Sequence, residues 1–180
     1  MPTPPTFVSG QPLTAAQMNT IGAHLVKVQT VGSGVSSVTV SGAFSADYDN
    51  YRVIYSGGVG STGINLRLQL GSAAANYYGS IIYTTYSSAT VTALVTNAGT
   101  SCQYVGGADT SFAHLSCDIF GPYLTKPTLV HCQYQDATAF GTSNYRLADT
   151  TSYTAFTITP NLGTLTGGTI RVYGYRNSLT

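Results

Sequence analysis

The carboxylates are the first residues of this chain that could do chemistry. Asp47 and Asp49 lie two residues apart, and glycoside hydrolases use a pair of carboxyl groups across the scissile bond. Asp side chains also hydrogen-bond the backbone of turns. We expect turn solvation and keep a polysaccharide-degrading hydrolase as the less favoured alternative, because the chain has no Glu and only six Asp: Asp47, Asp49, Asp109, Asp118, Asp136 and Asp149.

Two histidines occupy comparable places in strand-like runs. His114 and His131, with Asp118 and Cys117 or Cys132, could be combined into a metal site. Side chains alternate between the two faces of a strand, however, which places the histidines opposite to the cysteines. A serine hydrolase would need a G-x-S-x-G turn, which the chain lacks. The sequence therefore predicts no metal, no cofactor and no enzyme.

The tyrosines suggest carbohydrate binding, because exposed aromatic rings can stack on sugars. The densest cluster holds Tyr77, Tyr78, Tyr83 and Tyr86. Strand alternation separates Tyr77 and Tyr83 from Tyr78 and Tyr86, so that only some of the rings share a face. We take Tyr77 and Tyr83 as candidate contacts to a glycan. The alternative is that these rings pack across strands inside a sandwich.

The three cysteines, Cys102, Cys117 and Cys132, are an odd number and show no C-x-x-C spacing. Cys117 and Cys132 share their strand phase with apolar neighbours, as buried small hydrophobic residues do. We expect reduced thiols in the core. One disulfide is the alternative, because the even 15-residue spacing could bring neighbouring strands side by side.

The composition predicts an all-β protein. Tyr occurs 14 times, Gly 20 times and Glu not at all, so β-formers and turn residues replace surface helix formers. Only 7% of residues are charged and the net charge is +1, whereas ordinary domains have about 25% charged residues. With no basic stripe we expect no nucleic-acid partner. So few charges favour a homo-oligomer or a particle subunit.

Alternating apolar residues and glycine-rich breaks define the expected strands of an antiparallel β-sandwich with a jelly-roll-like arrangement. The Ser36–Gly57 stretch contains two of them around an aromatic and acidic corner, at Phe44, Tyr48 and Tyr51. The expected strands are His24–Val31, Ser36–Ser41, Tyr51–Gly57, Ile64–Leu70, Tyr77–Ser87, Thr90–Thr96, Ser101–Val105, Ser111–Phe120, Thr128–Gln135, Asn144–Ala148, Tyr153–Thr159 and Thr169–Arg176.

The first 24 residues differ from the rest of the chain. Four prolines before residue 13 predict an extended arm, and a short helix is expected after Thr14. Such a segment would become ordered by docking on another chain through Phe7, Leu13, Met18 and Ile21. We therefore divide the chain into an anchoring arm, 1–24, and a β-sandwich domain, 25–180. No secretory leader or membrane span is expected, and we predict synthesis in a cytoplasm.

Three stretches resemble structural proteins of tailed bacteriophages. FVSGQPLTAAQMNTI, from Phe7 to Ile21, resembles the opening arm and "LTAxxMN" helix of these proteins. AFSADYDNYRVIYSG, from Ala43 to Gly57, resembles the "YxxYRV" strand of tail-fibre and minor tail modules. GGTIRVYGYRNS, from Gly167 to Ser178, resembles their "GTIxLYG" closing strand.

The resemblance implies a virion component with an N-terminal anchor and a projecting β-sandwich, often a trimer. It implies a tail or fibre protein that attaches to the host surface, with capsid decoration or a head fibre as the alternative. The expected partners are further copies of the chain and other virion proteins of the tail or capsid. The chain lacks the repetitive shaft of a long fibre, and a short knob or decoration is therefore expected.

Overall fold

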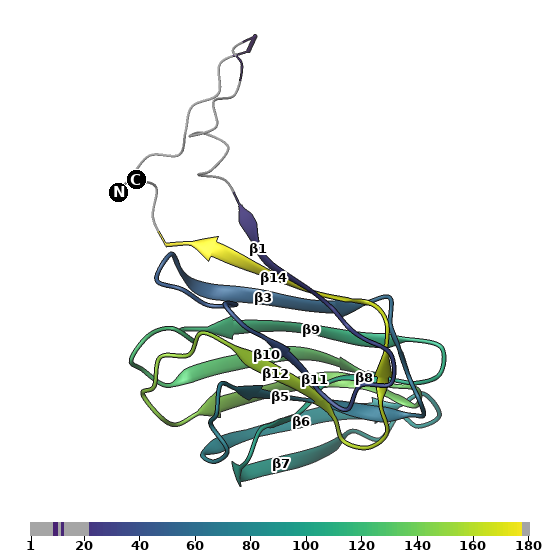
Figure 1. Cartoon of the computed structure of the whole chain (residues 1–180). Helices are drawn as coiled ribbons and strands as arrows, with labels where there is room; N and C mark the ends of the chain where they lie inside the picture. Colours follow the sequence, from purple (N-terminus) through teal and green to yellow (C-terminus); the bar gives the residue numbers. More distant parts are fainter. Residues whose placement is uncertain (1–8, 11, 13–21, 178–180) are drawn as a thin grey trace.

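The computed structural model describes residues 9–10, 12 and 22–177 of the chain. This part is built from antiparallel strands, and the described residues contain no helix. The strands are β1 Ala23–Thr30, β2 Val38–Val40, β3 Tyr48–Ser56, β4 Val59–Gly60, β5 Ile64–Leu70, β6 Tyr77–Thr85, β7 Thr92–Gly99, β8 Cys102–Ala108, β9 Ala113–Phe120, β10 Thr128–Gln135, β11 Ala139–Leu147, β12 Phe156–Pro160, β13 Leu165–Thr166 and β14 Thr169–Arg176 (Figure 1).

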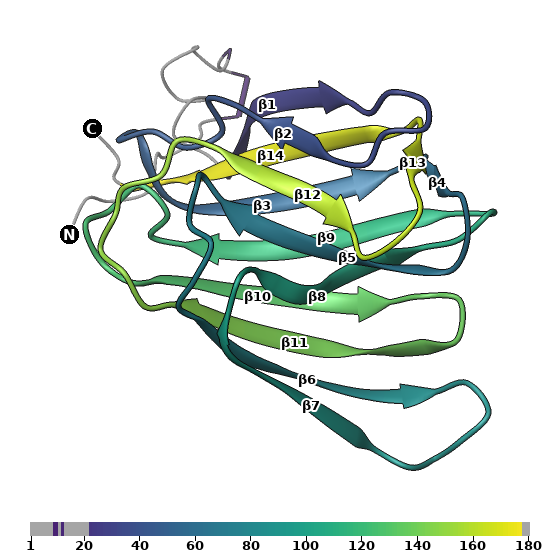
Figure 2. The same ribbon diagram turned by 60° about the horizontal axis from the view of Figure 1, so that its bottom comes forward.

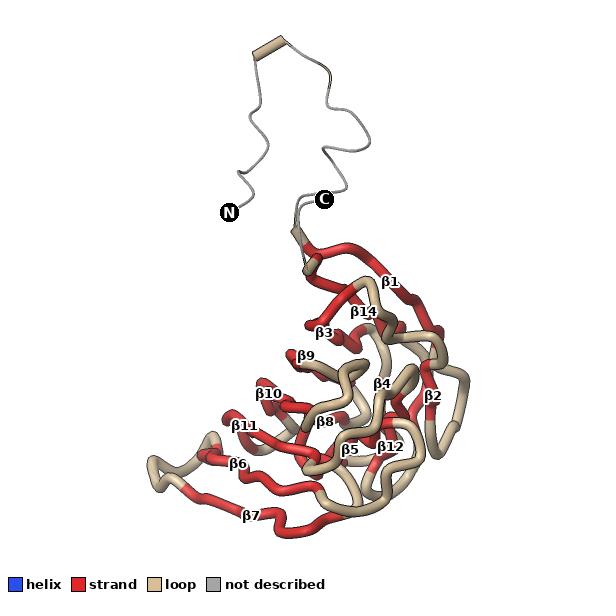
Figure 3. The backbone as a smooth tube through the Cα atoms, turned by 90° about the vertical axis from the view of Figure 1, so that its left-hand side faces the viewer, coloured by secondary structure: helices blue, strands red, loops and turns tan. Residues whose placement is uncertain are grey.

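Two layers make up the sandwich. The larger layer has the strand order β1-β14-β3-β9-β10-β11-β6-β7, and the smaller has the order β2-β12-β5-β8. Strand β9 joins them, because its first residues pair with β8 and its later residues pair with β10. Figure 3 shows the larger layer as a curved line of strands, with the smaller layer on the concave side. The expected all-β class and antiparallel sandwich are thus confirmed.

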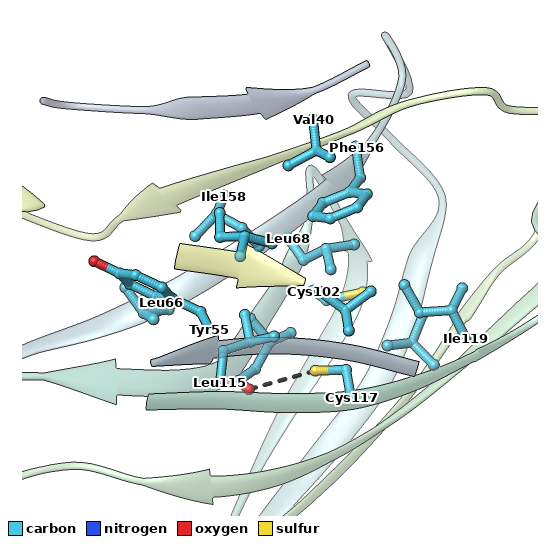
Figure 4. Close-up of a cluster of buried hydrophobic side chains, with 14 of the residues drawn as sticks. Val40, Tyr55, Leu66, Leu68, Cys102, Leu115, Cys117, Ile119, Phe156 and Ile158 are labelled. Atoms are coloured by element: carbon cyan, nitrogen blue, oxygen red, sulfur yellow. Dashed lines mark hydrogen bonds between the residues drawn. The ribbon is translucent and has the colours of Figure 1, made fainter. Parts of the chain in front are cut away.

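The core lies between the layers and follows the alternation in the sequence. Strand β5 buries Ile64, Leu66, Leu68 and Leu70 and leaves the residues between them half exposed, as the pattern predicts. Phe156 and Ile158 of β12 are also fully buried. Figure 4 shows these side chains meeting residues of β9 from the opposite layer.

The expected strands are all present, and three of them have the expected bounds: Ile64–Leu70, Thr128–Gln135 and Thr169–Arg176. Two strands, β4 and β13, were not expected, because two residues are too few to show alternation. Strand β11 begins five residues before the expected Asn144, and this extension is needed for the site described below. The expected helix after Thr14 lies almost entirely outside the described residues, and the structure gives it no support.

The aromatic corner at the start of β3 is a closed structural unit. Phe44 and Tyr51 are buried with their ring centroids 4.8 Å apart. The Tyr51 hydroxyl accepts a hydrogen bond from the Ser45 N–H, at 2.8 Å, and donates one to the Ser45 carbonyl, at 3.0 Å. Asp47 and Asp49 hydrogen-bond Ser45 and Asn177, so both carboxylates stabilise the corner, in line with the turn interpretation.

A disulfide joins the two layers' shared strand β9 to its neighbour β10. Cys117 and Cys132 lie directly opposite each other, with Cα atoms 4.1 Å apart, and their sulfurs are bonded. The prediction of reduced thiols is therefore wrong for these two residues, and the disulfide alternative holds. The physical reason is register: both side chains point into the core at the same level of adjacent strands. Cys102 is buried and free.

Candidate functional site

The two tyrosines selected from the sequence have different environments. Tyr77 is fully buried, and its hydroxyl accepts a 2.8 Å hydrogen bond from the Leu70 N–H. The ring has no open face for a sugar, so the expectation of a glycan contact at Tyr77 is corrected: this side chain packs inside the sandwich. Burial also raises the pKa of the Tyr77 hydroxyl. Tyr83, by contrast, is half buried and lines a cavity.

This cavity, here called the tyrosine cleft, has a volume of about 260 Å³. It opens between the layers beside the edge strand β7. Three aromatic rings from three strands face it: Tyr83 of β6, Tyr104 of β8 and Tyr134 of β10. The other lining residues are Asn65, Ile81, Thr85, Leu94, Asp136, Thr138 and Ala139.

A glycine of β11 lies between two of these rings in the larger layer. Across the larger layer, Tyr134 pairs with Gly141 and Gly141 pairs with Tyr83, so the three residues form one cross-strand row on the inner face. Gly141 lies against β6 so closely that an added Cβ would be 2.7 Å from the Cα of Tyr83. The absence of a side chain on the middle strand therefore permits the close pairing of β11 with β6 that positions Tyr83.

The third ring comes from the smaller layer and is held by side chains of β11. The Tyr104 N–H donates to the Tyr145 hydroxyl at 3.1 Å, and the Ser143 hydroxyl donates to the Tyr104 carbonyl at 2.5 Å. These bonds satisfy the edge of β8 where it has no strand partner. The rings of Tyr104 and Tyr134 meet edge to face, with centroids 6.0 Å apart. The wall of the cleft is therefore rigidly positioned.

Tyr134 is held by two polar neighbours. Its hydroxyl is a hydrogen-bond donor to the Asp136 carboxylate and to the Asn65 Oδ1, which lies 2.6 Å away. A hydroxyl has one proton, so the two acceptors share it. Burial, followed by the interaction with Asp136, raises the pKa of the Tyr134 hydroxyl, which keeps it protonated.

Asp136 is the one carboxylate that lines the cleft, and its side chain is hydrogen-bonded to the turn between β10 and β11. Its Oδ1 accepts hydrogen bonds from the N–H groups of Thr138 and Ala139, both at 2.7 Å, and from the Thr138 hydroxyl. Its Oδ2 accepts a hydrogen bond from the Tyr134 hydroxyl. The pair of carboxylates that the hydrolase alternative requires is therefore not found among the residues lining this cleft.

A second hollow of about 230 Å³ continues the tyrosine cleft. It shares Asn65, Asp136 and Thr138 with the cleft and adds Asn161 and the backbone around Gly63. Asn161 accepts a 2.9 Å hydrogen bond from the Asn65 N–H. The lining of both hollows contains no Lys or Arg. Together they form a groove with aromatic rings at one end and amide and hydroxyl groups at the other.

Such a groove is chemically suited to a sugar. Rings such as Tyr83 and Tyr104 offer apolar faces, and their hydroxyls have no hydrogen-bond partner within residues 22–177. Amide and hydroxyl groups of Asn65, Thr85 and Thr138 can exchange hydrogen bonds with sugar hydroxyls. With one carboxylate and no cation in the lining, neutral sugars fit and acidic sugars do not.

The remaining candidates lie elsewhere. His114 and His131 are on the outer face of the larger layer, opposite to Cys117 and Cys132, as alternation predicts. Burial lowers the pKa of His114. Among the described residues, no three His, Cys, Asp or Glu side chains are grouped closely enough to hold a metal. The anchor residues Phe7, Leu13, Met18 and Ile21 lie outside the described part of the chain.

Sequence reasoning missed two of the three rings of the cleft. Tyr104 and Tyr134 are far from Tyr83 in sequence, and only the pairing of β11 between β10 and β6 places Tyr134 in the row of Tyr83. The alternation along β10 does place Tyr134 on the buried face of its strand. It does not show that β10 lies two strands away from β6, and so it could not bring Tyr134 together with Tyr83.

Comparisons with known proteins do not identify the chain: no protein-family model and no curated protein sequence matches it. Within residues 22–177 there is no helix of the length and hydropathy needed to cross a bilayer.

Proposed function

We propose that this protein is a structural component of a phage particle that binds a surface glycan of the host. In this proposal the first 24 residues anchor a jelly-roll-like sandwich to the tail as a short fibre or knob. The observation that carries the proposal is the position of the tyrosine cleft relative to the chain ends, because the two lie at opposite ends of the strands.

The two ends of the sandwich are defined by strand register. Ala23, the first residue of β1, pairs with Tyr175 near the end of β14, so the described chain enters and leaves at one end. The hairpins β6–β7 and β10–β11 turn at the other end (Figure 2). Asp136, Thr138 and Thr85 belong to that end, which we call distal. A sandwich attached through residues 1–24 would therefore present the cleft away from its attachment point.

The low charge of the chain supports a place within an assembly. With 7% charged residues, a free monomer would have little electrostatic protection against self-association. We propose a homo-oligomer, with a trimer as the preferred state, docked on other virion proteins through Phe7, Leu13, Met18 and Ile21. Capsid decoration remains the alternative location.

The proposal is tested by removing the arm. Deletion of residues 1–21 should leave a folded sandwich, with unchanged circular dichroism and unchanged glycan binding, that no longer enters particles. A control carrying substitutions only in the exposed 86–91 loop should be incorporated normally. Normal incorporation of the deleted chain would contradict the anchor. Cryo-microscopy of particles with the full chain then distinguishes tail from capsid.

A further inference from the structure

Within the described part of the chain, the larger layer has two edge strands with a single partner each, β1 and β7, at the two ends of its curved line of strands (Figure 3). Open edges invite pairing with another chain, and proteins usually protect them with charges, prolines or bulges. Strand β7, with the sequence TALVTNAG, contains no charged residue and no proline. Val95 is 78% exposed on it. We infer that β7 is a contact surface for a second copy of this chain and that its partner strand is β1.

The directions of the two edges fit this pairing. All neighbouring strands of the layer are antiparallel and there are eight of them, so β1 and β7 run in opposite directions. Adding β1 of one copy to β7 of the next therefore continues the antiparallel pattern. It also keeps the distal ends of all copies on the same side.

The regular parts of the two edges lie at the same level. On β1 the register shifts between Leu25 and Lys27, which leaves Lys27–Thr30 regular at the distal end. On β7 the shift falls after Thr96, which leaves Thr92–Thr96 regular at the same end. One cross-strand row links Leu94 at one edge to Lys27 at the other, through Ile81, Ser143, Cys132, Cys117, Val53 and Val172.

The exposed apolar side chains of the edges also correspond. The two neighbouring rows lie on the outer face. One runs from Val95 on β7 to Leu25 on β1, and the other runs from Ala93 on β7 to Val28 on β1. Leu25 is 55% exposed and Val28 is 48% exposed. Row-by-row pairing would place Ala93 against Val28 within the regular part of β1 and Val95 against Leu25 just beyond its register shift, and would shield all four.

A two-fold pairing of β7 with β7 of a second copy accounts for fewer of the exposed apolar side chains. It would cover Ala93 and Val95 but leave Leu25 and Val28 exposed, and it would point the two distal ends in opposite directions. In the β1–β7 arrangement each copy uses both edges, so the contact is head-to-tail, and we infer that the curvature of the layer closes it into a ring rather than an open filament. This inference concerns the sandwich alone and does not depend on where the protein is attached.

Light scattering on the purified full chain at about 50 μM gives the first test. The expected wild-type result is a discrete oligomer, and V95K should convert it to monomer by placing a charge in the new sheet. The matched control L129K adds the same charge at a half-exposed residue in the middle of the same face and should leave the oligomer intact. Circular dichroism confirms that both variants fold. A wild-type monomer, or an oligomeric V95K, would overturn the inference.

Cysteine cross-linking identifies the partner strand. The chain's own cysteines are buried or bonded and should not react. A mixture of A93C and V28C proteins should give a mixed disulfide dimer, while A93C alone should stay uncross-linked. Homodimers of A93C without the mixed product would show two-fold pairing of β7 and would overturn the β1 assignment.

Discussion

Tyr83 and Tyr134 flank Gly141 in a single cross-strand row, so the two rings that line the cleft come from strands on either side of one glycine. Two consequences follow from this relationship. The cleft depends on strand β11 beginning at Ala139, where its pairing with β6 also begins. It also depends on a residue whose Cβ would collide with the backbone of β6.

A side chain at Gly141 should therefore strain the pairing of β11 with β6 and displace Tyr83 in the cleft wall. We expect G141A to lower the free energy of unfolding by about 1–3 kcal/mol, a typical cost of overpacking, and to weaken glycan binding. Urea denaturation and a binding assay measure the two effects. Gly63, where a Cβ would meet nothing within 4 Å, provides the control: G63A should change stability by less than half as much. Equal effects at the two positions would contradict the close approach.

The Tyr51 hydroxyl should contribute measurably to stability. In Y51F the N–H and carbonyl of Ser45 lose their partner, and we expect the free energy of unfolding to fall by about 1–2 kcal/mol. Y48F is the control, because the Tyr48 hydroxyl has no hydrogen-bond partner within residues 22–177. Chemical denaturation of both variants measures the difference. If Y48F were as destabilised as Y51F, the corner bonds would not be the cause.

The disulfide makes a countable prediction. Unfolded, unreduced protein should show one free thiol per chain, that of Cys102, and reduction should raise the count to three. Closing a loop of this size is worth about 3 kcal/mol in the chain-entropy description, so reduction should lower the denaturation midpoint. Three free thiols before reduction would show that Cys117 and Cys132 are not bonded in the protein as made.

Alkaline pH should destabilise the fold through the buried tyrosines. Burial raises the pKa of Tyr145 to about 12, with smaller effects from its neighbours. An unfolded tyrosine ionises near pH 10. Between these values the unfolded chain binds fewer protons, so stability is complete below about pH 10 and falls as the pH rises toward 12.

The slope for each such tyrosine is about 1.4 kcal/mol per pH unit. Denaturation midpoints from pH 8 to 11.5 measure the fall, and the absorbance at 295 nm shows which tyrosines ionise before unfolding. Y145F should reduce the slope. A midpoint that stays constant to pH 11.5 would contradict burial of the tyrosine hydroxyls.

Much of the fold was accessible from the sequence because alternation reports burial directly. The pattern of Ile64 to Leu70 predicted both a strand and its buried face. Strand β11 shows where this fails: it was expected to begin at Asn144 but begins at Ala139, and Gly141 permits its close pairing with β6. Alternation also does not reveal the order of strands in a sheet. For this reason Tyr77 was chosen as a glycan contact, and Tyr104 and Tyr134 were missed as residues of the cleft. Prediction of the disulfide likewise required the register between β9 and β10, which the sequence does not show.

Binding of a neutral sugar in the tyrosine cleft, as we propose, is measured most directly by the affinity of cleft variants for purified host polysaccharides. We expect the full chain to bind neutral polysaccharides in preference to uronate-containing ones. Y83A and Y104A should each weaken binding at least tenfold, about 1.4 kcal/mol. Y78A, on the same strand but the opposite face, should bind normally. Unchanged affinity in Y83A and Y104A, or equal loss in Y78A, would contradict the account.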